Sequence, residues 1–252
     1  MNYIEHIVEP ERLLLSWQAR EGHDRRRHFV AELRRSGSDA DLIYLPDSPD
    51  YREAKAKGFE GEYPGLPADR DHRAVLPIFM RRLPPRYRAD FDAFLEAIRI
   101  RPGTAVSDLG LLGYAGARLP GDDFCLIHPF DGAAPPFEFL LPLTGYHYYQ
   151  EGVPYESIRI GMPARFELEP DNLHDPDAVR AILPDVSDTT AGYVCRGLLP
   201  QFRKWLLGGL DVRATVERKN GPGDNPQVYL FVAVRVGNRS SRTSSGAVAA
   251  TR

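Results

Sequence analysis

The chain has 252 residues, enough for one good hydrophobic core or two small ones. With 42% hydrophobic and 27% charged residues it has the composition of a folded protein, which argues against a low-complexity or disordered polypeptide. A formal net charge of -3 and only two cysteines argue against a protein that is basic throughout and against a disulfide framework. No apolar run approaches the roughly 20 residues of a membrane span, and the first residues lack a signal-peptide pattern, so we expect a cytoplasmic protein.

Strand patterns open the first half of the chain. Residues 13–20 and 42–45 fit strands, and a regular segment ending at Arg35 lies between them after the charged stretch 22–28. The basic run at 25–27 is more typical of a charged loop than of a nucleic-acid contact.

The clearest helix signal covers residues 88–99, because four apolar positions recur there at helical spacing and prolines and glycine bracket the segment. Those apolar positions are Phe91, Phe94, Leu95 and Ile98. Residues 108–116 then lead into a short strand at 124–127. The first half is therefore predicted to be a mixed α+β module.

Beyond a Pro- and Gly-rich stretch the chain becomes β-rich. Alternating patterns predict strands at 165–169, 212–217 and 228–236, and one helix interrupts them, with Pro200 in its first turn and Gly208 at its end. We expect strands closing around one helix into a small barrel. The predicted division is an α+β module over 1–128, a linker over 129–138, a barrel over 139–236 and a disordered tail over 237–252.

The run 168–179, which reads LEPDNLHDPDAV, resembles the signature of HIRAN domains, with its Asn-x-x-Asp motif beside a proline and an Ala-Val strand. Three further pieces follow the order of that family. Residues 145–149 (GYHYY) resemble its first strand, 191–194 (AGYV) its later strand and 198–207 its helix. The resemblance covers about a hundred residues and implies an α+β chain ending in a small HIRAN β-barrel with a helix.

HIRAN domains of eukaryotic fork-remodelling translocases hold the 3′-hydroxyl end of single-stranded DNA, so the resemblance implies a DNA-binding module. Asp175 matches the family's acceptor for the hydroxyl, with Asn172 beside it, and Tyr148 matches a platform for a base. His174 stands where DNA-binding members carry a second aromatic residue, and His147 replaces a basic residue of the first strand. The candidate nucleic-acid-binding residues are His147, Tyr148, Asn172, His174, Asp175, Tyr193 and Arg196.

Each of these residues also has a structural interpretation. Asn172 and Asp175 fit a turn, because short polar side chains bond their own backbone. Tyr148 fits packing at a barrel rim, and Arg196, with Arg203 and Lys204, fits a solvated face. Both interpretations stay open at the level of sequence.

The first half resembles, more faintly, the N-terminal subdomain of HipA-family kinases. The matching pieces are LP at 66–67, VLPIFMRRLP at 75–84 and DLGLLGYAGA at 108–117. Arg81-Arg82 and Tyr114-Ala115 depart from the family's pattern, and the kinase core would lie where the HIRAN-like part begins. The resemblance implies an alternative function, that of a bacterial antitoxin or accessory protein that binds a HipA-like kinase in a toxin–antitoxin system.

Motifs of catalysis are missing from the sequence. It contains no Gly-x-x-x-x-Gly-Lys-Ser/Thr loop, no Gly-x-Ser-x-Gly and no His-x-x-x-His pair, and Cys125 and Cys195 stand at no metal-ligand spacing. The glycines at 110, 113 and 116 lack the context of a phosphate loop. We therefore expect a protein that is not an enzyme, with no catalytic residues, cofactor or metal ion, whose partner is the 3′ end of single-stranded DNA.

Overall fold

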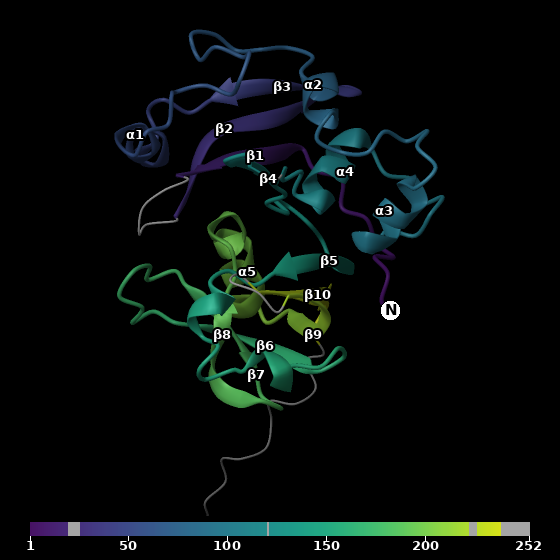
Figure 1. Cartoon of the computed structure of the whole chain (residues 1–252), viewed down its shortest axis with the longest axis vertical. Helices are drawn as coiled ribbons and strands as arrows, with labels where there is room; N and C mark the ends of the chain where they lie inside the picture. The colour runs from purple at the N-terminus through teal and green to yellow at the C-terminus, as the bar shows by residue number, and fades with distance from the viewer. Residues whose placement is uncertain (20–25, 120, 222–225, 238–252) are drawn as a thin grey trace, which may run out of the picture.

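Two antiparallel sheets, one above the other in Figure 1, form the framework of the computed structural model, which describes residues 1–19, 26–119, 121–221 and 226–237. The first sheet has the strand order β3-β2-β1-β4. Its strands are β1 (Arg12–Gln18), β2 (Arg27–Ser36), β3 (Asp39–Tyr44) and β4 (Phe124–Ile127). Strand β4 returns from far along the chain to pair with β1. The strands predicted in the first half are confirmed, with shifted ends.

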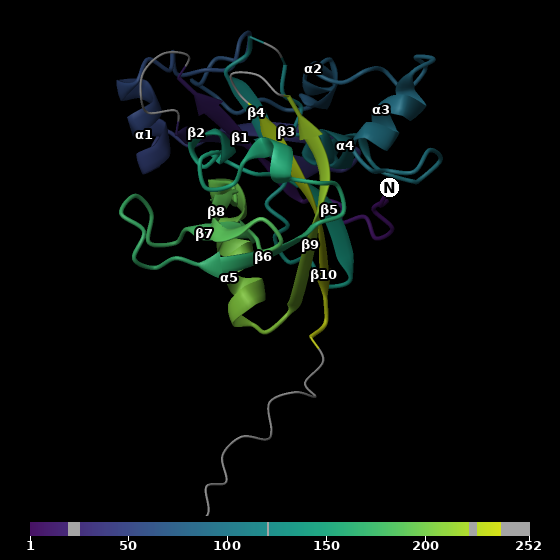
Figure 2. The same ribbon diagram turned by 60° about the horizontal axis from the view of Figure 1, so that its bottom comes forward.

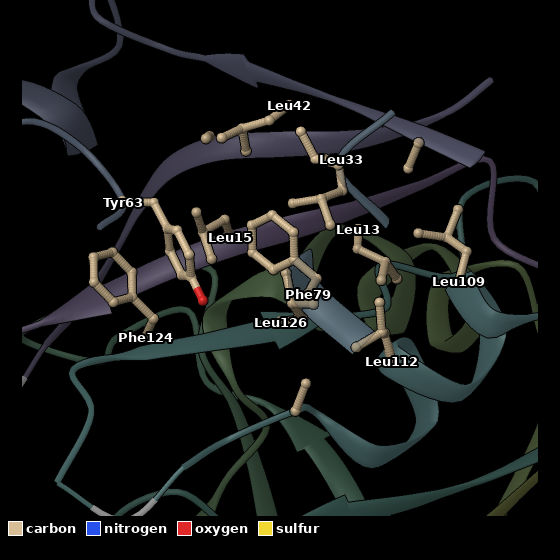
Figure 3. Close-up of a cluster of buried hydrophobic side chains, with 14 of the residues drawn as sticks. Leu13, Leu15, Leu33, Leu42, Tyr63, Phe79, Leu109, Leu112, Phe124 and Leu126 are labelled. Atoms are coloured by element: carbon tan, nitrogen blue, oxygen red, sulfur yellow. The ribbon is translucent and has the colours of Figure 1, made fainter. Parts of the chain in front are cut away.

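Four helices accompany the first sheet (Figure 1). They are α1 (Pro49–Ala56), α2 (Leu76–Met80), α3 (Phe91–Ala97) and α4 (Asp108–Ala115). The helix predicted over 88–99 is present as α3, and its residues Phe91 and Leu95 are buried. This core includes side chains from strands β1 to β4 and from all four helices, and those from the strands, α2 and α4 converge in Figure 3.

Helix α4 was not predicted, because two glycines lie inside it and glycine lowers helix propensity. Ser107 caps its first turn by accepting the N–H of Gly110 at 2.9 Å, and Gly116 ends it in the left-handed conformation. The inner glycines have a packing reason. A Cβ at Gly113 would lie 2.8 Å from Leu13 Cδ2, so the helix can approach β1 this closely only without one. The glycines at 110, 113 and 116 are therefore explained by the packing and the end of helix α4.

The second sheet has the order β5-β10-β9-β6-β7-β8. Its strands are β5 (Phe137–Pro142), β6 (Pro163–Leu168), β7 (Val179–Leu183), β8 (Ser187–Tyr193), β9 (Asp211–Asn220) and β10 (Gln227–Arg235). Helix α5 (Leu199–Leu207) contacts β7 and β9 (Figure 2) and buries Phe202 and Trp205. The helix and the strands predicted at 165–169, 212–217 and 228–236 are therefore confirmed, with shifted ends. The short helical turns are η1 (Tyr146–Tyr148), η2 (Tyr155–Ser157) and η3 (Arg196–Leu198).

The predicted closed barrel is wrong for the described residues, because β5 and β8 are the two edges of an open sheet. Only one isolated bridge joins these edges, between Thr144 and Tyr193, with both N–H···O distances at 2.9 Å. The strand expected at 145–149 is wrong too. Gly145 is left-handed (φ 77°) and turns the chain into η1 before a ladder can extend. The overall class remains α+β.

Burial extends through the stretch predicted as a linker. Phe130 and Phe137 are buried with their rings stacked at 5.6 Å, and β5 begins at Phe137. The first residues also contact the second sheet: His6 Nδ1 lies 3.2 Å from Oε1 of the buried Glu138, which pairs with Arg235 of β10. The division into domains stays a prediction, and the proposed tail beyond residue 237 lies outside the described residues. Within the described part of the chain, every helix is too short or too polar to cross a membrane.

Candidate functional site

A cleft of about 660 Å³ lies between the two sheets. Its lining comes from β1, β2, β4, α3 and α4 on one side and from β5, β9, β10, η1 and η3 on the other. This volume falls within the roughly 300–1,000 Å³ of ligand-binding pockets. The cleft is therefore large enough to hold a small-molecule ligand or a short segment of a polymer.

The lining of the cleft is basic. It includes five arginines, and none of its described residues is an Asp or a Glu. The arginines are Arg26, Arg27, Arg118, Arg196 and Arg218. The whole chain has a net charge of -3, so the acidic residues lie elsewhere and positive charge is concentrated here. Low-dielectric walls around like charges strengthen the local potential, which favours an anionic ligand.

Aromatic rings lie among these arginines. Tyr148 in η1 is 67% exposed and its ring contacts the His147 ring at 3.7 Å. The guanidinium of Arg218 lies 4.1 Å from the centroid of the Tyr229 ring. Arg218 Nε is buried and has no hydrogen-bond partner among the described residues. The cleft thus combines cationic donors with flat apolar surfaces.

His128 also lines the cleft but adds no charge at neutral pH. Burial lowers its pKa to about 4. Its Nε2 donates to the Val8 carbonyl at 2.9 Å, while Nδ1 accepts the N–H of Phe130 at 3.0 Å. These two contacts require the neutral ring with its proton on Nε2. The positive charge of the lining therefore comes from the arginines.

Arg196 connects the two halves. Its guanidinium donates to both carboxylate oxygens of Asp50 at 3.1 Å and to the carbonyl of Arg27 at 2.9 Å. It also lies over the Phe29 ring, 5.4 Å from the centroid. Because Asp50 neutralises much of its charge, Arg196 serves first as a tether between η3 and the first sheet. It still faces the cleft, as the binding interpretation requires.

The loop that carries the Asn-x-x-Asp motif is held by its own hydrogen bonds. Asn172 Oδ1 accepts the N–H groups of His174 at 3.0 Å and Asp175 at 3.1 Å, and Asp175 Oδ1 accepts that of Asp177 at 2.9 Å. Asn172 Nδ2 donates to Glu169 at 2.6 Å. The structural interpretation of Asn172 as a turn residue is therefore confirmed, because its oxygen serves the backbone.

Tyr193 ties this loop to the sheet edge. Its hydroxyl donates to Glu169 Oε2 at 2.7 Å and accepts from Asn172 Nδ2 at 3.2 Å. Burial, followed by the hydrogen bond to Glu169, raises the pKa of Tyr193, so the hydroxyl keeps its proton. The Tyr193 ring meets that of Tyr149 at 5.8 Å. The loop is thus linked to η1 through Tyr193 and the bridge at Thr144.

The seven predicted residues fall into two groups. His147, Tyr148 and Arg196 line the cleft, whereas the other four lie outside its lining. Those four are Asn172, His174, Asp175 and Tyr193. Sequence reasoning missed Arg118, Arg218 and Tyr229, which carry much of the character of the cleft. They come from α4, β9 and β10 or their flanks, and no spacing along the chain connects them.

Both cysteines line the cleft as free thiols. Cys125 is buried, and its Sγ lies 3.0 Å from Ser16 Oγ and 3.0 Å from Arg27 Nη1. Burial raises the pKa of the Cys195 thiol to about 11, which keeps it protonated. Unpaired thiols agree with the expectation from cysteine spacing.

Comparisons with known proteins add little to this site. No protein-family model and no curated protein matches the chain. Among solved structures, the chain is similar to the HIRAN domain of human HLTF, with a TM-score of 0.31 and 15% sequence identity, over 38% of this chain and 74% of that chain. A likeness this weak carries no argument about function. The resemblance to HipA-family kinases stays a prediction.

Proposed function

We propose that the chain binds single-stranded nucleic acid in the cleft between its sheets, without a chemical step. The observation that carries this proposal is the basic lining: five arginines and no acidic residue among the described lining residues. Arginine forms charge-assisted and often bidentate hydrogen bonds with phosphate oxygens. A phosphodiester backbone repeats such groups, so it fits a lining whose cations are spread over several elements.

The aromatic residues favour a single strand over a duplex. Tyr148 presents a ring that is 67% exposed beside the cleft, and unpaired bases stack on such rings with about 1–3 kcal/mol each. Bases in a duplex already stack on one another and cannot use this surface. The phosphates would lie against the arginines while a base covers Tyr148.

Arg118 offers the cleanest test, because it is exposed and its loss disturbs little packing. We expect Arg118→Gln to weaken binding of labelled single-stranded DNA severalfold in fluorescence anisotropy, while duplex DNA binds poorly to either protein. For the unmodified chain, the logarithm of affinity should fall with the logarithm of salt concentration with a slope of about -2, as expected for about three phosphate contacts.

Arg213→Gln is the matched control. Arg213 is 79% exposed on β9 and is absent from the described lining of the cleft. Its replacement removes the same charge as Arg118→Gln. If both variants weaken DNA binding equally, binding depends on net charge alone, and the proposal that the cleft is the binding site is refuted. Binding that salt does not weaken would refute phosphate contacts altogether.

The finer part of the proposal concerns the end of the strand. The resemblance of 168–179 to HIRAN domains assigns the terminal 3′-hydroxyl to Asp175, and the contacts of Tyr193 link this loop to η1, which carries Tyr148. A strand leaving the cleft over Tyr148 would bring its last nucleotide toward the loop. This geometry supports recognition of a free 3′ end of DNA.

Asp175→Asn tests this assignment, because the amide oxygen can still accept the N–H of Asp177 and preserve the turn. We expect the variant to lose several times more affinity for strands with a free 3′-hydroxyl than for strands with a 3′-phosphate. Asp177→Asn in the same loop, 63% exposed, should change neither. Equal losses on both strand ends would reject the hydroxyl role and leave the cleft proposal intact.

A further inference from the structure

Behind the cleft, one imidazole and two carboxylates meet between β2 and α1. His28 is on β2, and Asp50 and Glu53 are one helical turn apart on α1, so both acids face the same side. One ligand atom from each of the three residues lies within 4.8 Å of the others. No motif in the sequence indicates this group, because more than twenty residues separate His28 from the two acids.

The imidazole nitrogen that faces the acids lacks a partner. His28 is fully buried, and its Nδ1 has no hydrogen-bond partner among the described residues. Glu53 Oε2 lies 3.6 Å from this nitrogen, too far for a hydrogen bond. An unsatisfied buried polar group destabilises the folded protein. A cation held between Nδ1 and the two carboxylates would remove that destabilisation.

We propose that His28 Nδ1, Asp50 and Glu53 bind a divalent first-row transition-metal ion. One nitrogen and two carboxylate oxygens form a ligand set suited to Zn²⁺ and similar ions, whereas Mg²⁺ and Ca²⁺ prefer oxygen alone. In a tetrahedral site with bonds of about 2.1 Å, ligand atoms lie about 3.4 Å apart. Glu53 is 47% exposed, so its side chain can rotate by the small distance required, although its Oε2 also lies 3.9 Å from Arg26 Nη1.

Asp50 retains room for the ion. An ionised carboxylate accepts about four hydrogen bonds, and three reach Asp50: two from Arg196 and one from the N–H of Phe29. Only one of the three reaches Oδ1. Asp50 can therefore coordinate the ion through Oδ1 and still hold the Arg196 tether.

Lys57 competes with the ion. Its Nζ lies 3.4 Å from His28 Nε2, on the other side of the ring. When Nδ1 binds metal, Nε2 carries the proton and repels the ammonium. Lys57 is exposed at the end of α1, so it can turn into solvent. Loss of the Lys57 charge should therefore strengthen metal binding, an effect that a metal bound elsewhere would not show.

Titration calorimetry of the full chain with Zn²⁺ tests the site, with Mg²⁺ as the control ion. We expect one Zn²⁺ per chain, an affinity at least about tenfold weaker in Glu53→Gln and a tighter affinity in Lys57→Ala. Glu60→Gln, an exposed change just beyond α1, should match the unmodified chain. The ¹⁵N resonance of His28 Nδ1 should shift when Zn²⁺ is added.

Three results would overturn the proposal: no Zn²⁺ uptake, uptake that Glu53→Gln leaves unchanged, or a His28 Nδ1 resonance that does not respond. Thermal unfolding of each variant without metal shows whether the fold is intact. The site is independent of the proposed function, because neither Zn²⁺ uptake nor the resonance requires nucleic acid.

Discussion

Replacing Glu217 with alanine is expected to lower the free energy of unfolding by about 3–5 kcal/mol. Glu217 on β9 accepts from Arg99 Nε at 2.7 Å, and both side chains are less than a tenth exposed. It also accepts from the backbone N–H and the side-chain amide of Asn2. Removing the carboxylate would leave the Arg99 guanidinium buried without its anionic partner. An uncompensated buried charge is the main cost of breaking a buried ion pair.

Glu5→Ala provides the matched comparison. Glu5 pairs with Arg101 at 3.0 Å, and both side chains are more than half exposed, so its loss should cost less than about 1 kcal/mol. Urea unfolding of the two variants measures the difference. Equal losses would mean that Arg99 finds water or another partner when Glu217 is gone.

Acidification is expected to destabilise the chain through His128. Burial lowers the pKa of this ring from its ordinary value of 6.5 to about 4, so the unfolded chain binds the proton first as the pH falls. The contribution to stability is complete above pH 6.5 and is lost progressively until the pH reaches about 4. The shift corresponds to a loss on the order of 3 kcal/mol.

His128→Gln isolates this contribution, because the amide can still donate to the Val8 carbonyl but does not titrate. Carboxylates make the free energy of unfolding depend on pH in both proteins. The expected result is therefore a difference between the two proteins in the slope of this free energy against pH. The free energy of unfolding should fall less steeply between pH 6.5 and pH 4 in the variant. Parallel slopes would show that the folded protein accommodates a charged His128.

Local patterns predicted the elements well where each pattern belonged to one segment. The apolar stripe of α3 and the alternating residues of β9 and β10 are complete within their own segments, and each formed where expected. Helix α4 was not predicted, because the contact that explains Gly113 is made with Leu13 on β1, outside the helix itself. The prediction of a closed barrel was wrong for a similar reason. A single turn at Gly145 ends the pairing between the edge strands, and no strand pattern reveals it.

The candidate site was harder to predict than the fold. Asn172 and Tyr148 belong to one resemblance, yet the structure places only Tyr148 in the lining of the cleft. Arg118 and Arg218 line the same cleft although a hundred residues separate them in the chain, so neither composition nor spacing indicates that they share it. The net charge of -3 even argued against a basic surface, because an average over the chain hides how charge is distributed.

The contacts made by the first six residues also bear on the order in which the protein can fold during synthesis. Asn2 bonds to Glu217, and His6 bonds to Glu138. The ribosome makes these partners long after it has made the start of the chain, and domains otherwise tend to fold from the N-terminus as they emerge. Asn2 and His6 can therefore reach these two partners only after β5 and then β9 leave the exit tunnel, although Glu5 can pair with Arg101 earlier. The final contacts of Asn2 and His6 thus depend on strands that are made more than a hundred residues later.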